Sequence, residues 1–251
     1  MRIPRIFVDT PLKNATSTTL TGGAARHVIK VLRLRAGAPL LLFDGSGAEF
    51  PAVIESLDGA NVAVRVGVAE RPVRESPLAV TLVQGVARGE RMDYTIRKAV
   101  ELGVHAIQPL LTERSVVHLD AARGERRLAH WRQIALAACE QSGRTVAPRL
   151  YPPLRLDEWL ESPIGAALRV LFDPRATRPF ATLDLPPRQP LCLLVGPEGG
   201  LSEDECAAAR ARGFVAATLG PRVLRTETVA LAALAVAQFL WGDFGRTRRA
   251  P

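Results

Sequence analysis

The stretch from Leu191 to Trp241 repeats one arrangement of residue types, and this repeat constrains the fold more than any other feature. In each copy, a short apolar run is followed by a Gly-Pro loop and then by a segment with helical character. The apolar runs are Leu191–Val195 and Val215–Leu219, and the loops begin at Gly196 and Gly220. Buried strands that alternate with helices are typical of a parallel sheet. Because loops at the carboxyl ends of parallel strands meet in one crevice, the two loops predict a ligand site.

Residues 78–172 show the same alternation. Apolar runs at Leu78–Val83, Ala106–Leu111 and Leu168–Phe172 have the composition of buried strands. Arg91–Leu102 and Ala121–Gln141 carry apolar residues every three or four positions, which is typical of amphipathic helices. With the two later modules, this pattern predicts an α/β domain built on a parallel sheet.

The first 72 residues differ, because short apolar segments are joined there by turns. Asp44-Gly45 and the following Ser46-Gly47 are a strong hairpin signal, and one helix is predicted at about Gly23–Leu34. The predicted strands are Arg5–Val8, Pro39–Phe43, Ala48–Leu57 and Asn61–Val68. We therefore expect a small β-barrel with one helix. The charged segment Glu70–Pro77 predicts a linker, so the predicted domains are residues 1–72 and 73–251.

The net charge of +8 and the pI of about 10.4 favour an anionic partner, nucleic acid above all. Only three basic residues are lysines, so a bias in genome composition is an alternative explanation for the excess of arginine. The predicted helix places its basic side chains opposite its apolar face. We expect this face to bind RNA phosphates, and a merely solvated face is the alternative. Its basic residues are Arg26, His27, Lys30, Arg33 and Arg35.

Several classes of site are disfavoured by what the sequence lacks. Neither Gly-Pro loop fits the P-loop or the GxGxxG pattern. The three cysteines form no CxxC pair and the four histidines are scattered singly, so we expect neither disulfides nor a metal site. The N-terminus has no apolar signal core and the run Val229–Trp241 is too short to cross a bilayer. We therefore expect no membrane association. The absence of a cysteine-pairing pattern fits a protein of the reducing cytoplasm.

The residues after the first Gly-Pro loop favour a ligand without phosphate. Ser202 and Glu205 form a predicted capping box, and Glu203 and Asp204 add negative charge to the same helix N-terminus. A phosphate ligand binds at a helix N-terminus of this kind, and these acidic side chains would repel it. An uncharged or cationic ligand held by backbone groups suits the loop better, and S-adenosylmethionine, a sulfonium cation without phosphate, meets this description.

The segments Leu194–Leu201 and Leu219–Thr228 closely resemble the bacterial 16S ribosomal RNA (uracil-N3)-methyltransferases, the RsmE family of the SPOUT class. Further similar segments follow in the family's order and cover nearly the whole chain. They are Arg2–Arg5, Phe43–Gly45, Arg74–Pro77, Arg88–Met92, Lys98–Gly103 and Ala137–Arg144. Apart from Pro174-Arg175-Ala176, the segment Tyr151–Gln189 is the least similar.

The resemblance implies a PUA-like RNA-binding β-barrel for residues 1–72 and a SPOUT α/β trefoil-knot methyltransferase domain for residues 73–251. It implies that S-adenosylmethionine is the cofactor and that N3 of a specific uridine in the decoding region of 16S rRNA, in the small ribosomal subunit, is methylated. It further implies a cytoplasmic homodimer with its sites near the subunit interface.

The resemblance, together with the charge pattern of the N-terminal helix, gives the predicted site residues. The predicted cofactor contacts are Leu171, Phe172, Gly196, Pro197, Glu198, Gly199, Gly200, Leu219, Gly220, Val223, Leu224, Arg225 and Thr226. The predicted RNA contacts are Arg5, Arg26, His27, Lys30, Arg33, Arg35, Arg88 and Arg91.

N3 of uracil carries a proton at neutral pH, so the reaction needs a proton acceptor and a group that stabilises the anion. Glu140 and Arg144 have the i, i+4 spacing that brings two side chains together on a helix. We expect Glu140 to be the base and Arg144 to stabilise the anion, with Arg225 as the third catalytic candidate. The alternatives are an intrahelical ion pair of Glu140 with Arg144, a contact of Arg225 with RNA phosphate or Glu227, and Glu198 as the base.

Two other functions stay open on the sequence. A non-catalytic RNA-binding or ribosome-assembly factor with this fold would bind RNA in a salt-dependent way without binding the cofactor. A related methyltransferase would modify a ribose 2′-oxygen or transfer RNA, and the matches in the N-terminal region argue against it.

Overall fold

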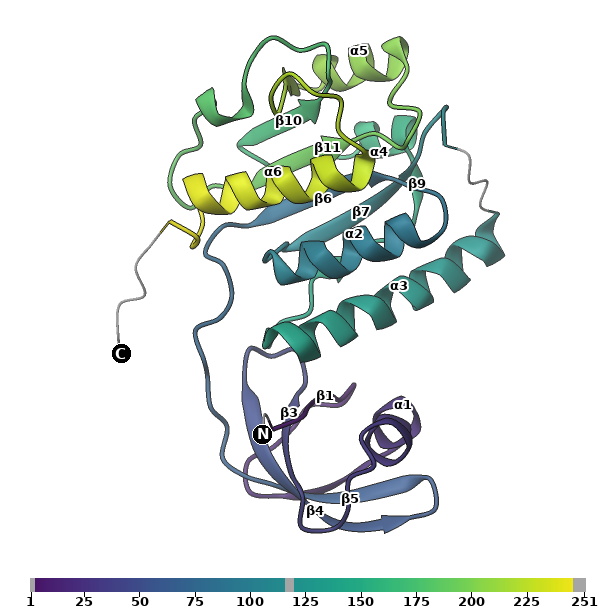
Figure 1. The fold of residues 1–251 in the computed structure, drawn as a ribbon, viewed down its shortest axis with the longest axis vertical. Coiled ribbons are helices and arrows are strands. Elements are labelled where there is room, and N and C mark those ends of the chain that lie inside the picture. Colours follow the sequence, from purple (N-terminus) through teal and green to yellow (C-terminus); the bar gives the residue numbers. More distant parts are fainter. Residues whose placement is uncertain (1–2, 116–119, 246–251) are drawn as a thin grey trace. The chain divides into compact units, whose positions relative to one another are not determined.

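The computed structural model describes residues 3–115 and 120–245, and these fall into two compact units (Figure 1). The first unit comprises the chain up to Glu75 together with Cys139–Ala147. The second unit comprises Ser76–Ala138 and the chain from Pro148 onward. The predicted domains, residues 1–72 and 73–251, did not include this return of the chain to the first unit.

The first unit contains, among the described residues, a five-stranded sheet with the order β1-β3-β4-β5-β2. β1 runs parallel to β3, and the other neighbouring strands are antiparallel. Its strands are β1 (Arg5–Phe7), β2 (Ser17–Leu20), β3 (Pro39–Phe43), β4 (Glu49–Asp58) and β5 (Asn61–Val66). Alternate residues such as Leu40 and Leu42, or Val62 and Val64, are buried in one core, because successive side chains of a strand point to opposite faces.

The helix of the first unit is shorter and less regular than predicted. α1 (Gly22–Arg26) continues into a π-helical segment, η1 (His27–Val31), so the helix ends before Leu34. Arg33 has a φ of +53°, which takes the chain out of the helical conformation. The buried side chains of this helix belong to the same core as the strands.

The second unit contains, within the described part of the chain, a seven-stranded sheet in which all neighbouring strands are parallel. Its order is β12-β10-β11-β6-β7-β8, and β9 also pairs with β7. The strands are β6 (Val80–Gly85), β7 (Ala106–Leu111), β8 (Arg149–Leu150), β9 (Leu154–Arg155), β10 (Leu168–Phe172), β11 (Leu191–Val195) and β12 (Val215–Ala217). The prediction of a parallel sheet is confirmed.

Helices cover both faces of this sheet. α2 (Glu90–Glu101) and α6 (Thr226–Leu240) lie side by side, and α6 contacts β6 and β11 (Figure 1). α4 (Leu156–Glu161) and α5 (Glu203–Ala211) share a second core with alternate residues of β11. α3 (Ala121–Ser142) is joined to α2 by the indole of Trp131, whose Nε1 donates to Asp93 Oδ1 at 3.2 Å. No helix of the described residues is long and apolar enough to span a membrane.

Some short elements escape the sequence patterns. These are β2, β8, β9, α4 and a single 3-10 turn, η2 (Phe180–Thr182). β2 reads Ser-Thr-Thr-Leu with only Leu20 buried, and β8 and β9 have two residues each. Such segments are too short or too polar to show an apolar period.

The segment predicted as a linker takes part in the first unit through its charges. Arg74 Nη1 lies 2.8 Å from Glu49 Oε2, and Arg5 pairs with the same carboxylate. Glu75 Oε1 accepts hydrogen bonds from the backbone N–H groups of Thr145 and Val146 at 3.0 and 3.1 Å. These bonds attach the returning segment Cys139–Ala147 to the end of the first unit.

A candidate active site at the carboxyl ends of the strands

A hollow of about 620 Å³ lies at the ends of β10 and β11, on the carboxyl edge of the parallel sheet. We call it the strand-end hollow. It is lined by residues 172–175, 195–201 and 223–227, with Arg91, Arg114, Cys206 and Val229. Its volume suits a small-molecule ligand, and it lies where an open α/β sheet binds ligands.

Glycines determine the path of the first Gly-Pro loop. Gly200 has a φ of +70°, in the left-handed region, and its N–H donates to Pro197 O at 2.9 Å. Gly85, the last residue of β6, lies against the same loop. A Cβ built on Gly85 would come within 2.5 Å of Pro197 N. Because Pro197 N is a backbone atom that cannot rotate away, only glycine at position 85 lets the loop pass this close.

Thr226, the first residue of α6, joins the second loop to the first. Its Oγ1 donates to Gly196 O at 2.6 Å and accepts from Gln84 Nε2 at 2.8 Å. Gln84 and Thr226 are both buried. The two loops therefore meet in one place, as we expected from their positions after parallel strands.

Two carboxylates of the strand-end hollow are held by arginines. Asp173 accepts from the backbone N–H and the side chain of Arg175, and its other oxygen lies 3.3 Å from Arg210 Nη2. Burial would raise the pKa of Asp173, but these hydrogen bonds and charges outweigh it and lower the pKa below 3.8. Glu198 Oε1 accepts from Arg88 N at 2.9 Å and from Arg91 Nη1 at 2.8 Å. Burial is outweighed there too, so the pKa of Glu198 is lowered.

Glu227, in the first turn of α6, has a different environment. It is half-buried and lines the strand-end hollow. Its Oε2 is shielded from solvent and has no hydrogen-bond partner. A buried polar atom without a partner is rare in proteins, since leaving it unsatisfied costs about 1–3 kcal/mol.

Among the described residues, four arginines line the strand-end hollow, and three of them have protein partners. Arg91 pairs with Glu198, Arg175 pairs with Asp173, and Arg114 Nη1 donates to Gly199 O at 3.3 Å. Arg225 is exposed, and no hydrogen bond or ion pair of its side chain is formed within the described ranges. Its guanidinium is therefore available to a ligand.

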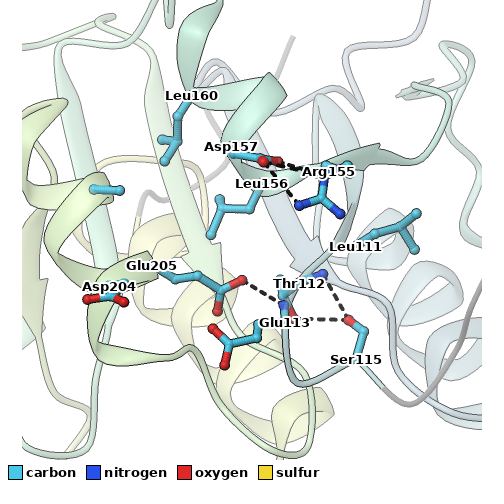
Figure 2. Close-up of a pocket in the computed structure, with 11 residues that line it drawn as sticks. Leu111, Thr112, Glu113, Ser115, Arg155, Leu156, Asp157, Leu160, Asp204 and Glu205 are labelled. Atoms are coloured by element: carbon cyan, nitrogen blue, oxygen red, sulfur yellow. Dashed lines mark hydrogen bonds and ion pairs between the residues drawn. The ribbon is translucent and has the colours of Figure 1, made fainter.

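A second hollow, of about 700 Å³, lies beside α4 and α5, and its lining includes the acidic residues Glu113, Asp157, Asp204 and Glu205 (Figure 2). Figure 2 shows Glu205 directed toward Glu113, whose backbone N–H donates to Glu205 Oε1 at 2.8 Å. The other carboxylate oxygen of Glu205 accepts from Ser202 N, and Ser202 Oγ accepts from Glu205 N, so the predicted capping box is confirmed. This hollow contains no predicted site residue. It shows instead how the turn at residues 112–115 is held to α5.

Most of the predicted cofactor residues line the strand-end hollow. They are Phe172, Gly196, Pro197, Glu198, Gly199, Gly200, Val223, Leu224, Arg225 and Thr226. Leu171 is fully buried in the core with α4 and α5, because it points to the face of β10 opposite to that of Phe172. Leu219 and Gly220 are not in the lining, since the second loop reaches the hollow only from Val223. The sequence did not single out Arg114 or Glu227 as pocket residues.

Glu140 lies in α3 but Arg144 does not, although their spacing predicted that both lie on one helix. α3 ends at Ser142 and Gly143 has a φ of +89°, so Arg144 lies beyond the helix and the i, i+4 argument is wrong for this pair. Both residues belong to the first unit, and neither lines the strand-end hollow.

The contacts of Glu140 and Arg144 hold the returning segment in place. Glu140 Oε1 accepts from Phe7 N at 3.0 Å. Burial raises the pKa of Glu140, although the Phe7 hydrogen bond opposes the rise. Arg144 is buried and its Nη2 lies 2.8 Å from Glu75 Oε2.

The predicted RNA contacts have different environments. The exposed ones are Arg26, Lys30, Arg33 and Arg35 of the first unit, with Arg88 and Arg91 of the second, and His27 is half-buried. Arg5 is only 7% exposed, pairs with Glu49 and lies over the Phe43 ring at 4.9 Å. The structure contradicts the RNA contact predicted for Arg5, because its guanidinium is already used inside the first unit.

The cysteines do not offer a nucleophile. All three are free and buried, and burial raises the pKa of Cys139 to about 11 and that of Cys192 to about 12. These thiols stay protonated at neutral pH, whereas thiolates are the reactive form. Within residues 3–115 and 120–245, no group of histidine, cysteine and acidic side chains is arranged to hold a metal ion.

Comparison with known proteins relates both units to RNA methyltransferases. The RNA methyltransferase domain family matches residues 74–238, and the RNA methyltransferase PUA domain family matches residues 20–66. Ribosomal RNA small subunit methyltransferase E of Buchnera aphidicola is 30% identical over 245 residues, which are 97% of this chain and 96% of the relative. The protein of the same name from Mycobacterium tuberculosis is 34% identical over 91% of this chain and 88% of the relative.

Two similar solved structures contain S-adenosylmethionine. One is a methyltransferase of Legionella pneumophila, with a TM-score of 0.93 and 37% identity over 97% of this chain and all of that one. The other is a ribosomal RNA small subunit methyltransferase E of Neisseria gonorrhoeae, with a TM-score of 0.90 at the same identity and coverage. The chain belongs to the ribosomal RNA small subunit methyltransferase E family of RNA methyltransferases.

Proposed function

We propose that this protein transfers the methyl group of S-adenosylmethionine to N3 of one uridine in the decoding region of 16S ribosomal RNA in the small ribosomal subunit. The strand-end hollow carries the proposal. Two Gly-Pro loops meet there at Thr226, in a chain whose relatives are named for methylation of small-subunit ribosomal RNA. Similar structures at 37% identity bind this cofactor.

The residues of the strand-end hollow fit S-adenosylmethionine. Backbone groups of residues 196–200 and 223–226 can hold the adenosine part. The carboxylates of Asp173 and Glu198 provide negative charge for a sulfonium cation. No phosphate is present in this cofactor, and the acidic N-terminus of α5 would disfavour one.

The protein contributes mainly orientation, since the bound cofactor supplies an already activated methyl group. The loops position the donor, and Arg225 stabilises the negative charge that develops on the uracil oxygens when N3 loses its proton. N3 lies on the base-pairing edge, so the uridine must be unpaired or flipped out. Arg88, exposed beside the hollow, and Arg91, exposed in its lining, hold the flanking RNA. The roles of Glu140 as base and Arg144 as anion stabiliser stay predictions.

The exposed arginines and the lysine of the first unit bind ribosomal RNA phosphates in this proposal. The protein acts as a homodimer in the cytoplasm, where ribosomal subunits are assembled. Its second unit has the trefoil knot that the resemblance implies. Phe239, 66% exposed at the end of α6, is an apolar side chain that a second copy can cover. Analytical ultracentrifugation measures the stoichiometry, and an experimental trace of the chain tests the knot.

The activity is tested with small ribosomal subunits that lack the modification. The protein and methyl-labelled S-adenosylmethionine are added, and the RNA is digested and mapped by mass spectrometry. We expect one N3-methyluridine in the decoding region of the 16S RNA. Methyl transfer to a ribose oxygen or to transfer RNA would contradict the proposal.

A calorimetric titration with S-adenosylmethionine separates the enzyme from a non-catalytic RNA-binding factor. The enzyme binds the cofactor without RNA. A protein that binds RNA in a salt-dependent way but shows no heat with the cofactor, and no methylation, is the assembly factor instead.

A further inference from the structure

The proposed reaction requires a group that removes the N3 proton, and this group must lie within hydrogen-bond reach of the uracil. Among the described residues, three that line the strand-end hollow carry a carboxylate: Asp173, Glu198 and Glu227. No histidine within residues 3–115 and 120–245 lines it. The environments of the three carboxylates decide which can accept a proton.

Asp173 is a poor proton acceptor because its charge is already stabilised. Its side chain is 5% exposed, and both oxygens lie close to an arginine, Arg175 at 3.2 Å and Arg210 at 3.3 Å. Protonation would remove the counter-charge that Asp173 offers to both guanidinium groups. The lowered pKa of Asp173 reflects this loss.

Glu198 is committed to the shape of the loop. The same oxygen accepts from Arg88 N and from Arg91 Nη1, so this side chain joins the first Gly-Pro loop to the start of α2. Its pKa is lowered as well. Protonation of Glu198 would weaken both bonds, because they stabilise its charged form.

Glu227 lacks such support. No donor reaches its Oε2, which is also shielded from water. A carboxylate oxygen in this state gains from a hydrogen-bond donor on a ligand, whereas Asp173 and Glu198 already accept such bonds from the protein. The imide N–H of uracil is such a donor.

The position of Glu227 is fixed relative to both loops. It follows Thr226, whose hydroxyl is bonded to Gly196 of the first loop. On the other side of Thr226 stands Arg225, the pocket arginine that lacks a protein partner within the described chain. A free carboxylate and a free guanidinium therefore flank the residue that ties the two cofactor loops together. These are the two groups that deprotonation of N3 requires.

We infer that Glu227 is a catalytic residue that takes the N3 proton of the target uridine. The inference rests on the proposed function. The N–H bond of the imide breaks and its proton passes to the Glu227 carboxylate. The N3 electron pair then forms the bond to the methyl carbon, while the bond between that carbon and sulfur breaks and leaves its electrons on sulfur. Arg225 balances the charge on the uracil oxygens, and Glu227 returns the proton to water after the product leaves.

Glu227→Gln keeps the shape of the side chain and removes the base. We expect the single-turnover methylation rate to fall by about 100-fold or more, as is typical when a general base is lost. The dissociation constant for S-adenosylmethionine should stay within about threefold of the wild-type value. Glu161→Gln, an exposed carboxylate at the end of α4, is the matched control and should keep the wild-type rate.

A more acidic substrate gives a readout that a structural role would not affect. Fluorine at C5 of uracil makes the N3–H more acidic, so RNA made with 5-fluorouridine needs less help from a base. We expect the rate deficit of Glu227→Gln to shrink markedly on this RNA, and to shrink further as the pH is raised. Glu140→Gln, the rival base, should show an equal deficit on both RNAs.

Distinct outcomes overturn the inference and the proposed function. Three outcomes overturn the role of Glu227. The rate deficit of Glu227→Gln is equal on both RNAs, or weakened cofactor binding accounts for the whole deficit. In the third outcome, the deficit of Glu140→Gln shrinks with fluorination. Absence of N3-methyluridine with the wild-type protein overturns the proposed function, before any variant is compared.

Discussion

The hydroxyl of Thr226 donates a hydrogen bond of 2.6 Å to the carbonyl oxygen of Gly196, and thereby connects the start of α6 to the first Gly-Pro loop. The two residues are far apart in the sequence, yet this bond sets the distance between the loops. Gln84 donates to the same hydroxyl and holds its orientation. Cofactor binding should therefore depend on Thr226 even though its side chain is buried.

Thr226→Val keeps the volume of the side chain and removes both bonds. We expect the dissociation constant for S-adenosylmethionine to rise by about tenfold, which corresponds to about 1.4 kcal/mol, within the range of a lost buried hydrogen bond. Calorimetric titration measures it. Thr228→Val, an exposed threonine of the same helix, is the control. Equal affinity of the two variants would show that the bond does not position the loops.

Gly85→Ala tests the close approach of β6 to the loop. The added Cβ would meet Pro197 N at 2.5 Å, so the loop must move outward. We expect weaker cofactor binding and a loss of about 1–3 kcal/mol in the free energy of unfolding. Denaturant unfolding and titration check both. Gly124→Ala in α3, where no atom lies within 4 Å of the new Cβ, should leave binding unchanged and stabilise the helix by up to about 1 kcal/mol.

Asp173→Asn should lower the free energy of unfolding at neutral pH by about 1–3 kcal/mol, because hydrogen bonds to a charged group are lost. The pKa of Asp173 in the folded protein is lowered from 3.8, so its stabilisation is present above that value and disappears as the pH falls through the lowered pKa. The difference between wild type and Asp173→Asn should therefore stay constant down to about pH 5 and shrink as the pH falls below about 4, the ordinary pKa range of an aspartate. Urea unfolding across this range measures it, and a difference independent of pH would contradict the assignment.

The basic face of the first unit is tested by salt dependence. Arg26→Gln with Lys30→Gln removes two exposed charges from α1 and η1. If each side chain contacts a phosphate, the plot of log association constant for RNA against log salt concentration becomes less steep. Its slope should decrease in magnitude by about two for the double variant. Filter binding of 16S RNA at several salt concentrations measures the slope. Arg65→Gln, on β5 with its side chain 69% exposed, is the control for a general loss of charge. A slope equal to that of the control would indicate that the face is only solvated.

The sequence by itself determined the features that depend on local pattern. Short, mainly apolar runs identified the strands β7, β10 and β11 with their bounds, since a strand covered on both faces of a sheet is mainly apolar. Ser202 and Glu205 are three residues apart, so their capping box could be read directly. The two Gly-Pro loops follow parallel strands, and this order placed the site at the carboxyl edge of the sheet.

Only the tertiary structure decided which charged side chains are free to act. Arg5 is paired with Glu49, Glu75 with Arg144, and Asp173 with Arg210, each across a long stretch of chain. Those pairings leave no periodic trace in the sequence, because they depend on where the chain returns. They exclude Arg5 from RNA binding, make Asp173 a poor base and leave Arg225 and Glu227 without partners in the described hollow. The physical reason is that a charge is available to a ligand only when no neighbour already satisfies it, and neighbours are defined by the fold.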